Sequence, residues 1–286
     1  MYTNISSLLE QCRQQNKPLH KVIMENESIV SGLDEQSMYN TLRERYSVML
    51  RSASRALDEP QEMVGNLISG QSRTQSEGGG ALVGEYLNRI MSRALSCSEV
   101  NASMGVICAA PTAGSCGIIP AVVIETAKKL DSSETDVLNA LAVAGAFGAV
   151  ITKNATVSGA EGGCQAECGV AAAMAAAAAV YLAKGSAEMC ADASAIALID
   201  CMGLVCDPVA GLVQLPCSYR NASQAVNAVI SADMALAGQH SAIPADEVIE
   251  AMYRVGKQLP PELRETAQGG IAKTPTAKDI AKHIFD

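Results

Sequence analysis

The feature that most limits the possible folds is a run of small apolar residues from Gly169 to Ala183, most of them alanine. The chain has 286 residues with 23 Gly, but only 2 Phe, 7 Tyr and no Trp. Ala, Val, Ile, Leu and Met must therefore form the core, and such side chains suit closely crossed helices better than a β-sandwich. No segment shows the alternating pattern of a β-strand. The sequence predicts an all-α, multi-helix domain with buried Ala-rich helices and Gly/Pro loops.

Helical periodicity divides the chain into two parts. Amphipathic helices are expected from Ile5 to Asp58, where Leu8, Leu9 and Cys12 recur at helical spacing. Residues 69–80 contain a Gly-Gly-Gly run and predict a loop, which is the best candidate boundary between N-terminal helices in 1–70 and a helical catalytic domain in 81–286. One continuous domain is the alternative. The later helices are expected at 81–95, 120–130, 134–151, 165–184, 186–202, 221–237 and 245–256, before a short tail helix.

Three details of these helices can be predicted from single residues. Ser133 and Asp136 have the spacing of a capping box, and Ser186 is a candidate cap of the helix expected at 186–202. Gly185 is expected to end the Ala-rich helix. Residues 140–151 are apolar all round, which predicts burial on every side.

Charge and composition exclude some classes of function. The formal net charge is −9, and no Lys/Arg stripe interleaves with aromatic residues, so a nucleic-acid binder is not expected. The Ala-rich run is short for a membrane span and predicts a buried helix of a soluble protein. The N-terminus does not resemble a signal peptide, which favours the reducing cytoplasm and argues against a disulfide framework among the ten Cys.

Three cysteines stand in particular contexts, beside glycine or proline: Cys164, Cys206 and Cys217. Three thiolates can hold three corners of a [4Fe–4S] cluster and leave one iron open as a Lewis acid. The remaining cysteines fit simple packing better, because free cysteine is often a buried small hydrophobe. These are Cys12, Cys97, Cys108, Cys190 and Cys201, while Cys116 and Cys168 flank the loops of interest.

Other uses of these thiols stay open at this point. Structural zinc sites usually contain close C-x₂-C pairs, and the chain has none. A ferredoxin-type run of cysteines is also absent. A Cys–His nucleophile is disfavoured because the only histidines, His20, His240 and His283, lie away from these motifs in the sequence.

Four segments together resemble a known family, the iron–sulfur-dependent L-serine dehydratases (L-serine ammonia-lyases). They are Ala110–Pro120 (APTAGSCGIIP), Asn154–Glu167 (NATVSGAEGGCQAE), Cys206–Cys217 (CDPVAGLVQLPC) and Arg264–Gly270 (RETAQGG). In size the chain resembles the α chain of the two-subunit bacterial form, whose β chain is a separate polypeptide. The resemblance implies a cytoplasmic, oxygen-sensitive and largely helical enzyme.

The resemblance implies that Cys164, Cys206 and Cys217 bind a [4Fe–4S] cluster, and that L-serine is converted to pyruvate and ammonia. Some single-chain relatives end in a cysteine that occupies the fourth iron, but this chain ends His-Ile-Phe-Asp. Cys116 stands where a small residue is expected, so its thiol is interpreted as packing. Hydroxyl, amide and backbone groups for the substrate carboxylate are expected from Thr112, Ser115, Asn154, Ser158 and Gln165.

The general base is not assigned by the sequence. Glu161, a group of the β chain and an oxygen bound to the open iron all remain candidates, whereas His240 lies in an ordinary helix-end context. Asp207 is expected to orient its loop, and Lys273 to be solvated. Competing functions are cluster-dependent L-cysteine desulfidation, a cluster-bearing subunit inactive without its β chain, and a helical scaffold that needs no cofactor.

Overall fold

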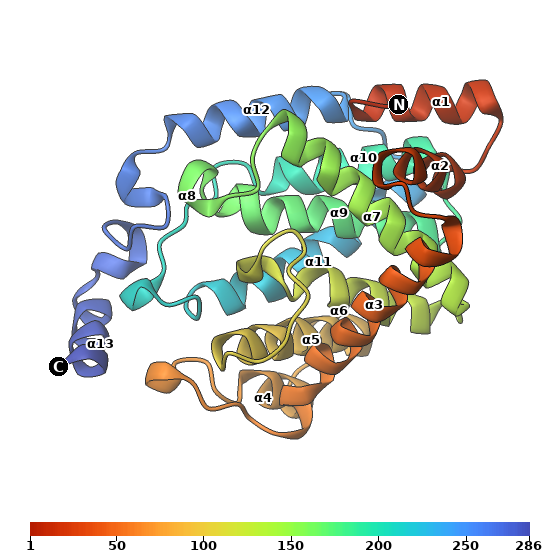
Figure 1. Cartoon of the computed structure of the whole chain (residues 1–286). Coiled ribbons are helices and arrows are strands. Elements are labelled where there is room, and N and C mark those ends of the chain that lie inside the picture. Colours follow the sequence, from red (N-terminus) through yellow and green to blue (C-terminus); the bar gives the residue numbers. More distant parts are fainter.

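The computed structural model describes residues 1–286 and confirms an all-α fold without β-strands. Figure 1 shows helices that cross one another in several directions, with the N-terminal helices on one side and the C-terminal helix α13 on the other. The α-helices are α1 (Ile5–Gln15), α2 (Leu19–Ser31), α3 (Glu35–Asp58), α4 (Gln71–Gly78), α5 (Gly84–Ala102), α6 (Ile118–Lys129), α7 (Glu134–Asn154), α8 (Gly159–Gly162), α9 (Val170–Leu182), α10 (Ala187–Asp200), α11 (Cys217–Leu236), α12 (Ala245–Gln258) and α13 (Pro275–Phe285).

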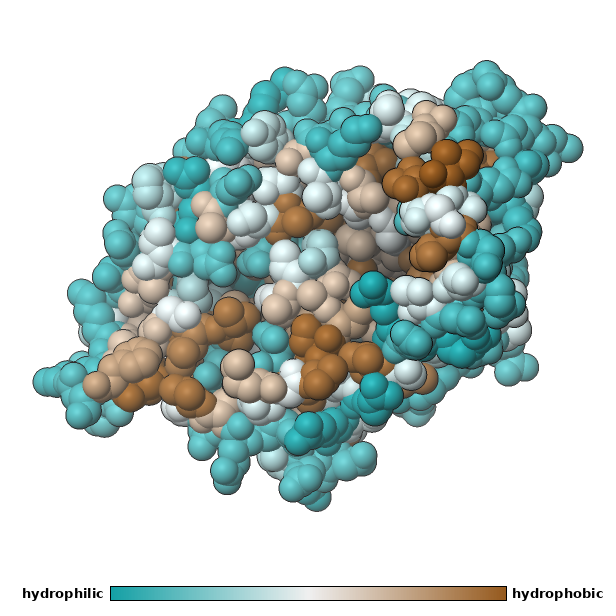
Figure 2. Space-filling model, in the orientation of Figure 1, coloured by the Kyte–Doolittle hydropathy of each residue, from teal (hydrophilic) through white to brown (hydrophobic).

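The surface is mostly hydrophilic but carries apolar areas. Figure 2 shows apolar surface gathered in several patches on the face that Figure 1 presents. Large apolar side chains with high exposure include Leu82, Met104, Val106 and Phe285. Exposed apolar surface that gathers in patches, rather than scattered singly, is typical of surfaces that meet a partner.

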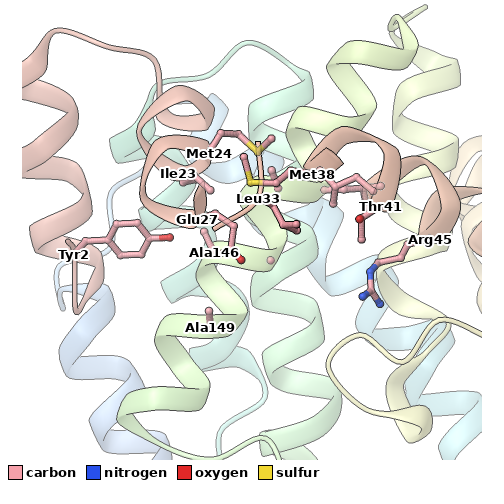
Figure 3. A pocket seen from close by; sticks show the side chains of 14 residues that line it. Tyr2, Ile23, Met24, Glu27, Leu33, Met38, Thr41, Arg45, Ala146 and Ala149 are labelled. Atoms are coloured by element: carbon pink, nitrogen blue, oxygen red, sulfur yellow. The ribbon is translucent and has the colours of Figure 1, made fainter. Parts of the chain in front are cut away.

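The prediction that α7 is buried on every side is wrong at Gly145 and Ala149, which are exposed. These small residues line an apolar cavity between α2, α3 and α7, into which Met24, Met38 and Leu33 also point (Figure 3). A neighbouring cavity along the same face extends to Pro111. An all-apolar sequence predicted burial, but α2 and α3 do not cover the whole face of α7.

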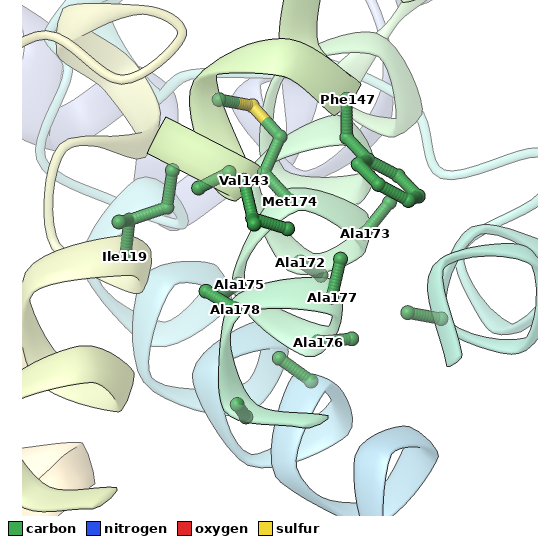
Figure 4. Close-up of a cluster of buried hydrophobic side chains, with 14 of the residues drawn as sticks. Ile119, Val143, Phe147, Ala172, Ala173, Met174, Ala175, Ala176, Ala177 and Ala178 are labelled. Carbon is green, nitrogen blue, oxygen red and sulfur yellow. The ribbon is translucent and has the colours of Figure 1, made fainter. Parts of the chain in front are cut away.

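Helix α9 lies at the centre of the core, packed against α6, α7, α10 and α11. All of its residues except Tyr181 are buried, which confirms the prediction for the Ala-rich run. Figure 4 shows the alanines of α9 beside the larger side chains of Ile119, Val143 and Phe147. Alanine faces allow helix axes to approach closely, so larger residues from neighbouring helices fill the remaining space.

Two helical segments are long and apolar enough to cross a membrane by composition alone. They are Glu134–Asn154 and Gln165–Leu182, and 72% and 89% of their apolar windows are buried inside the fold. Burial of this extent is typical of helices in a protein core.

The predicted helix ends are confirmed at two positions and wrong at a third. Ser133 Oγ accepts a hydrogen bond from Asp136 N at 3.2 Å, and Ser186 Oγ accepts one from Met189 N at 3.2 Å. At the end of α9, however, Lys184 rather than Gly185 adopts the left-handed conformation, with φ +61°. Gly185 is needed for another reason, because a Cβ there would lie 2.5 Å from Val180 Cγ1.

The predicted loop at residues 69–80 is wrong, because Gln71–Gly78 form α4 against α5. The fully buried Glu99 of α5 holds the start of this helix. Its carboxylate accepts hydrogen bonds from Ser72 N at 2.7 Å and Gly70 N at 2.9 Å. A distant carboxylate therefore satisfies the free N–H groups of a helix whose own sequence is rich in Ser and Gly.

Helices on both sides of the predicted domain boundary contribute to one apolar core. Leu8 of α1 and Val22 of α2 belong to the same cluster of buried side chains as Ile90 of α5 and Ala173 of α9. The division at residues 71–80 therefore stays a prediction, while the core itself crosses it.

Candidate active site

Cys164 lies in the short connection between α8 and α9. Gln165–Gly169 form a π-helical turn there, a rare element that often marks functional sites. Gly163 has φ +74°, and a Cβ on it would lie 2.9 Å from the carbonyl oxygen of Leu204. Only glycine allows this close passage of two backbones, and the resulting turn places Cys164 and Glu167 on one short segment.

Gln165 fixes this segment to the rest of the fold. Its Nε2 donates to the carbonyl oxygens of Gly162 at 2.9 Å and Met252 at 3.1 Å, and its Oε1 accepts from Gly203 N at 2.8 Å. The side chain is fully buried, and all three bonds go to backbone groups. A role for Gln165 in binding substrate stays a prediction.

Cys206 is held by the only β-bridge of the chain, which it forms with Arg264. Its N–H donates to the Leu263 oxygen at 2.9 Å, and its carbonyl accepts from Glu265 N at 2.8 Å. The bridge brings the loop after α12 alongside Cys206, although the two are far apart in sequence. It therefore places the Glu265 side chain next to this thiol.

Cys217 is the first residue of α11, and Asn221 follows it by one helical turn. Asn221 Nδ2 donates to the carbonyl oxygens of Gly114 at 2.7 Å and Cys217 at 2.9 Å, while its Oδ1 accepts from Gly117 N at 2.9 Å. One amide thus joins the start of α11 to the loop that carries Thr112 and Ser115.

An ion pair between Arg220 and Asp207 lies beside these thiols. Arg220 Nη2 and Asp207 Oδ1 are 2.8 Å apart, and Asp207 also accepts a hydrogen bond from Ile271 N at 2.8 Å. The expected role of Asp207 in orienting its loop agrees with these contacts. Arg220 was not singled out by the sequence.

Two carboxylates without a basic partner lie at the centre of the site. Oxygen atoms of Glu167 and Glu265 lie with Cys206 Sγ within 4.8 Å of one another, and neither glutamate forms an ion pair. Glu167 accepts a hydrogen bond from Thr112 Oγ1 at 2.9 Å. Burial, and then the charge of Glu265, raise the pKa of Glu167 to about 7. A positively charged ligand would relieve this repulsion.

Glycine makes room for these carboxylates. A Cβ on Gly159 would lie 2.5 Å from Glu167 Oε2 and 3.1 Å from Glu265 Oε2. A Cβ on Gly114 would lie 3.2 Å from Glu167 Oε1. Glycine in these loops therefore allows the backbone to pass close to the charged side chains of the site.

The three predicted ligand thiols lie close enough to affect one another. Burial, and then the charges of Cys164 and Glu167, raise the pKa of Cys217 to about 12 against the opposing charge of Arg220. Burial also raises the pKa of Cys206 far above its ordinary value, with a further contribution from Cys164. A hydrogen bond with Cys168, and less strongly Arg220, lower the pKa of Cys164 against the effect of burial. As thiolates, these groups need added positive charge nearby.

This donor set fits a multi-iron cluster better than one ion bound by three thiolates. The only three metal-ligating groups that lie within 4.8 Å of one another are Glu167, Cys206 and Glu265, which include one thiol. Thiols around a cluster bind different irons and stand further apart than ligands of a single ion. The buried thiols of Cys164 and Cys206 and the partly buried thiol of Cys217, which come from three segments, suit such an arrangement.

The structure brings some predicted substrate residues together and separates others. Thr112 and Ser115 lie beside Glu167, with their hydroxyls 3.1 Å apart. Ser158 caps the short α8 with its carbonyl oxygen and directly precedes Gly159. Asn154 is exposed at the end of α7, where it donates hydrogen bonds to Thr3 O at 2.9 Å and Val150 O at 2.8 Å. Its predicted role is untested by these contacts.

Sequence reasoning missed Glu167, Glu265, Arg220 and Asn221. Glu167 gave one usable signal, since it is the single charged residue at the start of an otherwise apolar helix. The residues weighed instead lie elsewhere: Glu161 is exposed on α8, and Lys273 is exposed after Gly270. His240 pairs with Asp192 at 2.8 Å with 72% of its side chain exposed.

The other cysteines behave mainly as packing residues. Cys12, Cys97, Cys190 and Cys201 are buried and Cys108 is partly buried. Cys116 lies with Cys97 in a small apolar cluster, and its thiol donates to the carbonyl oxygen of Cys97 at 3.7 Å. This agrees with the interpretation of Cys116 as a packing thiol.

The fold and the site define an all-α protein with a thiol- and carboxylate-rich site assembled from separate loops. The family model described as the serine dehydratase alpha chain matches residues 14–272. Two similar chains are "Probable L-serine dehydratase, alpha chain" of Bacillus subtilis, 43% identical over 100% of this chain and 96% of its own length, and "L-serine dehydratase, alpha chain" of Peptoniphilus asaccharolyticus, 42% identical over 100% and 99%. "L-serine dehydratase 2" of Escherichia coli is 35% identical over 97% of this chain, which spans only 63% of that longer protein.

These matches cover the chain from end to end. The chain therefore belongs to the serine dehydratase alpha chain family.

Proposed function

We propose that this chain is the cluster-bearing α chain of a [4Fe–4S]-dependent L-serine dehydratase, which converts L-serine to pyruvate and ammonia. The observation that carries the proposal is the gathering of three thiols, two buried and one partly buried, around carboxylates that lack a basic partner. The family match supports the substrate, and the donor set supports the cluster.

Cys164, Cys206 and Cys217 would hold the cluster. Burial raises the pKa of Cys206 and Cys217, so these two thiols need positive charge to ionise, and iron would supply that charge. When bound, the cluster would supply a Lewis acid that makes the β-hydroxyl of serine a better leaving group.

The protein's own groups would bind and orient the substrate. The Ser115 hydroxyl would donate to the substrate carboxylate, and the Thr112 hydroxyl would do so on leaving its bond to Glu167. Glu167 and Glu265 would offer negative charge to the ammonium group of the substrate. The two glutamates repel each other in the free chain, so a cation bound between them gains energy from both.

The reaction balances without another reactant. The Cα–H bond breaks and its proton goes to a base, while the Cβ–O bond breaks and hydroxide leaves with its electron pair, which together release one water. The resulting 2-aminoacrylate tautomerises to an imine, and hydrolysis of the imine consumes one water and gives pyruvate and ammonia. Glu167, whose Oε2 lies 3.9 Å from Cys206 Sγ, is the candidate base within this chain. A Glu167 variant with an unchanged rate would assign the base to another group.

A separate β chain is the proposed partner, and the cytoplasm the proposed location. The α chains named above match this chain over their whole length, whereas the Escherichia coli protein contains a further region beyond it. A partner chain would cover part of the exposed apolar patches that Figure 2 shows.

The test is iron and acid-labile sulfide per chain after anaerobic reconstitution, in wild type, Cys206→Ala and Cys190→Ala. Cys190 is a matched control because it is a fully buried cysteine in α10, outside the site. We expect both elements in wild type and in Cys190→Ala, and loss of both iron and serine turnover in Cys206→Ala. Full iron and activity in Cys206→Ala would refute the ligand assignment.

The same preparations separate the competing functions. L-Serine turnover well above L-cysteine turnover supports the dehydratase, and the reverse supports a desulfidase. Iron without sulfide would indicate a single ion at Glu167, Cys206 and Glu265 instead of a cluster. Activity that appears only after the β chain is added would make this chain a cluster-bearing subunit.

A further inference from the structure

The Arg220–Asp207 pair joins three segments that meet at the thiols. Arg220 lies on α11 one turn after Cys217, and its Nη1 donates to the carbonyl oxygen of Val205 at 2.7 Å. Its Nη2 bonds Asp207 Oδ1 at 2.8 Å, so one guanidinium binds the residues on both sides of Cys206. The helix that begins with one proposed ligand thus fixes the loop that carries another.

Asp207 extends this link to the loop after α12. Its second oxygen accepts a hydrogen bond from Ile271 N at 2.8 Å. Gly270 has φ +56°, and a Cβ there would lie 2.1 Å from Asp207 Oδ2, so only glycine lets this backbone approach the carboxylate. The same loop carries Glu265, and the ion pair therefore ties it to the thiols as well.

The pair is well shielded from water. The Arg220 and Asp207 side chains are 16% and 3% exposed. Removal of one member of such a pair leaves a charge that water cannot fully solvate. Each side chain makes two hydrogen bonds, which together connect α11, the loop of Cys206 and the loop after α12.

Arg220 also brings positive charge to the site. Its guanidinium bonds to the residues on both sides of Cys206, and its own helix begins at Cys217. Glu167 and Glu265 form no ion pair, and Arg220 is a cation that the fold places beside the proposed ligands.

We propose that Arg220 is a positioning residue of the cluster site, which sets the spacing of Cys206 and Cys217 through Asp207 and offsets the negative charge of the bound cluster. This inference rests on the proposed function. It predicts that Arg220 controls two separate properties, the retention of iron through geometry and the reduction potential through charge.

Lysine separates these two roles. Arginine has a rigid fork that can bond two acceptors at once, whereas lysine carries the same charge on a single flexible ammonium group. Arg220→Lys keeps the charge and loses one of the two bonds. Arg220→Gln loses the charge as well.

The experiment uses the full chain, reconstituted anaerobically, as wild type, Arg220→Gln, Arg220→Lys and Arg93→Gln. Arg93 is a matched control because it belongs to another ion pair, with Glu125, and its side chain is 14% exposed. Iron release to a chelator and the midpoint reduction potential are measured, together with the folded fraction by circular dichroism. Neither of the first two measurements reports enzyme activity.

In Arg220→Gln we expect iron release about 10- to 100-fold faster than in wild type. This is the range typical when a residue that holds metal ligands in place is lost. We also expect a more negative potential, because a positive charge near the cluster stabilises its reduced form. Arg220→Lys should release iron faster but keep a potential near that of wild type. Arg93→Gln should lower stability and change neither property.

Wild-type release rate and potential in a folded Arg220→Gln chain would overturn the inference. So would an equal change of potential in Arg93→Gln. If Arg220→Gln does not fold, Asp207→Asn removes the ion pair while it keeps an acceptor for Ile271 N, and unchanged iron release there would overturn the inference too. A wild-type chain that binds no iron and sulfide would refute the proposed function itself, and this inference with it.

Discussion

Two glutamates in different regions have opposite surroundings. Glu125 in α6 has a completely buried carboxylate that pairs with Arg89 at 2.8 Å, with Arg93, and with Lys128 at 3.3 Å. Burial opposes its ionisation, but Arg93 and then Lys128 outweigh burial and lower its pKa. Glu167 has a threonine hydroxyl, a thiol and a second carboxylate as neighbours, and its pKa is raised to about 7.

Glu125 and Glu167 differ in whether a positive charge lies next to the carboxylate. Glu125 is neutralised within the fold, so its ion pairs can only join α5 to α6. Glu167 is held in place without such neutralisation, an arrangement that costs stability and is typical of functional sites. Its missing partner is expected to be the ligand.

The largest effect is expected from Glu125→Ala. Removal of this acid leaves Arg93 partly buried beside Arg89 and Lys128 with no negative charge among them. We expect a loss of about 3 kcal/mol in the free energy of unfolding, as for other broken buried pairs. Urea denaturation measures this loss, and iron and sulfide per folded chain should equal those of wild type. A parallel loss of cluster would contradict the separation of the two regions.

The next effect is expected from Glu167→Gln, which keeps the shape of the side chain and removes its charge. If this carboxylate binds the substrate ammonium group, the loss of a charged hydrogen bond should lower kcat/KM by about 10- to 100-fold. The free energy of unfolding at pH 7 should rise rather than fall, because the neutral amide removes the cost of a buried carboxylate and its repulsion with Glu265. Steady-state kinetics with L-serine measure the first and urea denaturation the second.

Glu161→Gln is the control for this variant. Glu161 is an exposed glutamate six residues earlier in the chain, and it bonds none of the site residues. Its replacement should leave kcat/KM at the wild-type value. Wild-type kinetics in Glu167→Gln would show that Glu167 does not bind the substrate, and the contrast with Glu125 would then have no functional meaning.

Much of the fold could be predicted from sequence because its helices are determined locally. The alanines of α9 and the Ser133 cap act within a few residues of their position, and both predictions are confirmed. The errors arose where distant residues decide the outcome. Helix α4 depends on Glu99, and the exposure of Gly145 depends on where α2 and α3 pass.

The residues of the site show the same contrast between those that could be predicted from nearby sequence and those that could not. The cysteines could be singled out because glycine and proline surround them in the sequence. Glu265 could not, since its position next to Cys206 results from a bridge between segments almost sixty residues apart. The role of Asn221 was equally hidden, because its partners Gly114 and Gly117 lie in another loop.

A third prediction concerns the pH dependence of the Glu125 region. The pKa of Glu125 is lower in the folded chain than its ordinary value of 4.5, so its stabilising effect is complete above pH 4.5 and is lost as pH falls through the folded value. The difference in unfolding free energy between wild type and Glu125→Gln should therefore narrow on acidification. Urea denaturation from pH 7 to pH 3 measures it. A constant difference would mean that packing, rather than charge, accounts for the effect of Glu125.

The smallest effect is expected from Lys128→Met, which removes the most exposed of the three cations around Glu125. The Lys128 side chain is 56% exposed and its ammonium group lies 3.3 Å from the carboxylate, whereas Arg93 is 14% exposed. Water therefore screens Lys128 far more than Arg93, and we expect a loss of about 0.5 kcal/mol in urea denaturation. A loss as large as that of Glu125→Ala would mean that all three cations act as one network. A small loss would leave the two arginines, Arg89 and Arg93, as the groups that neutralise Glu125, the kind of partner that Glu167 lacks.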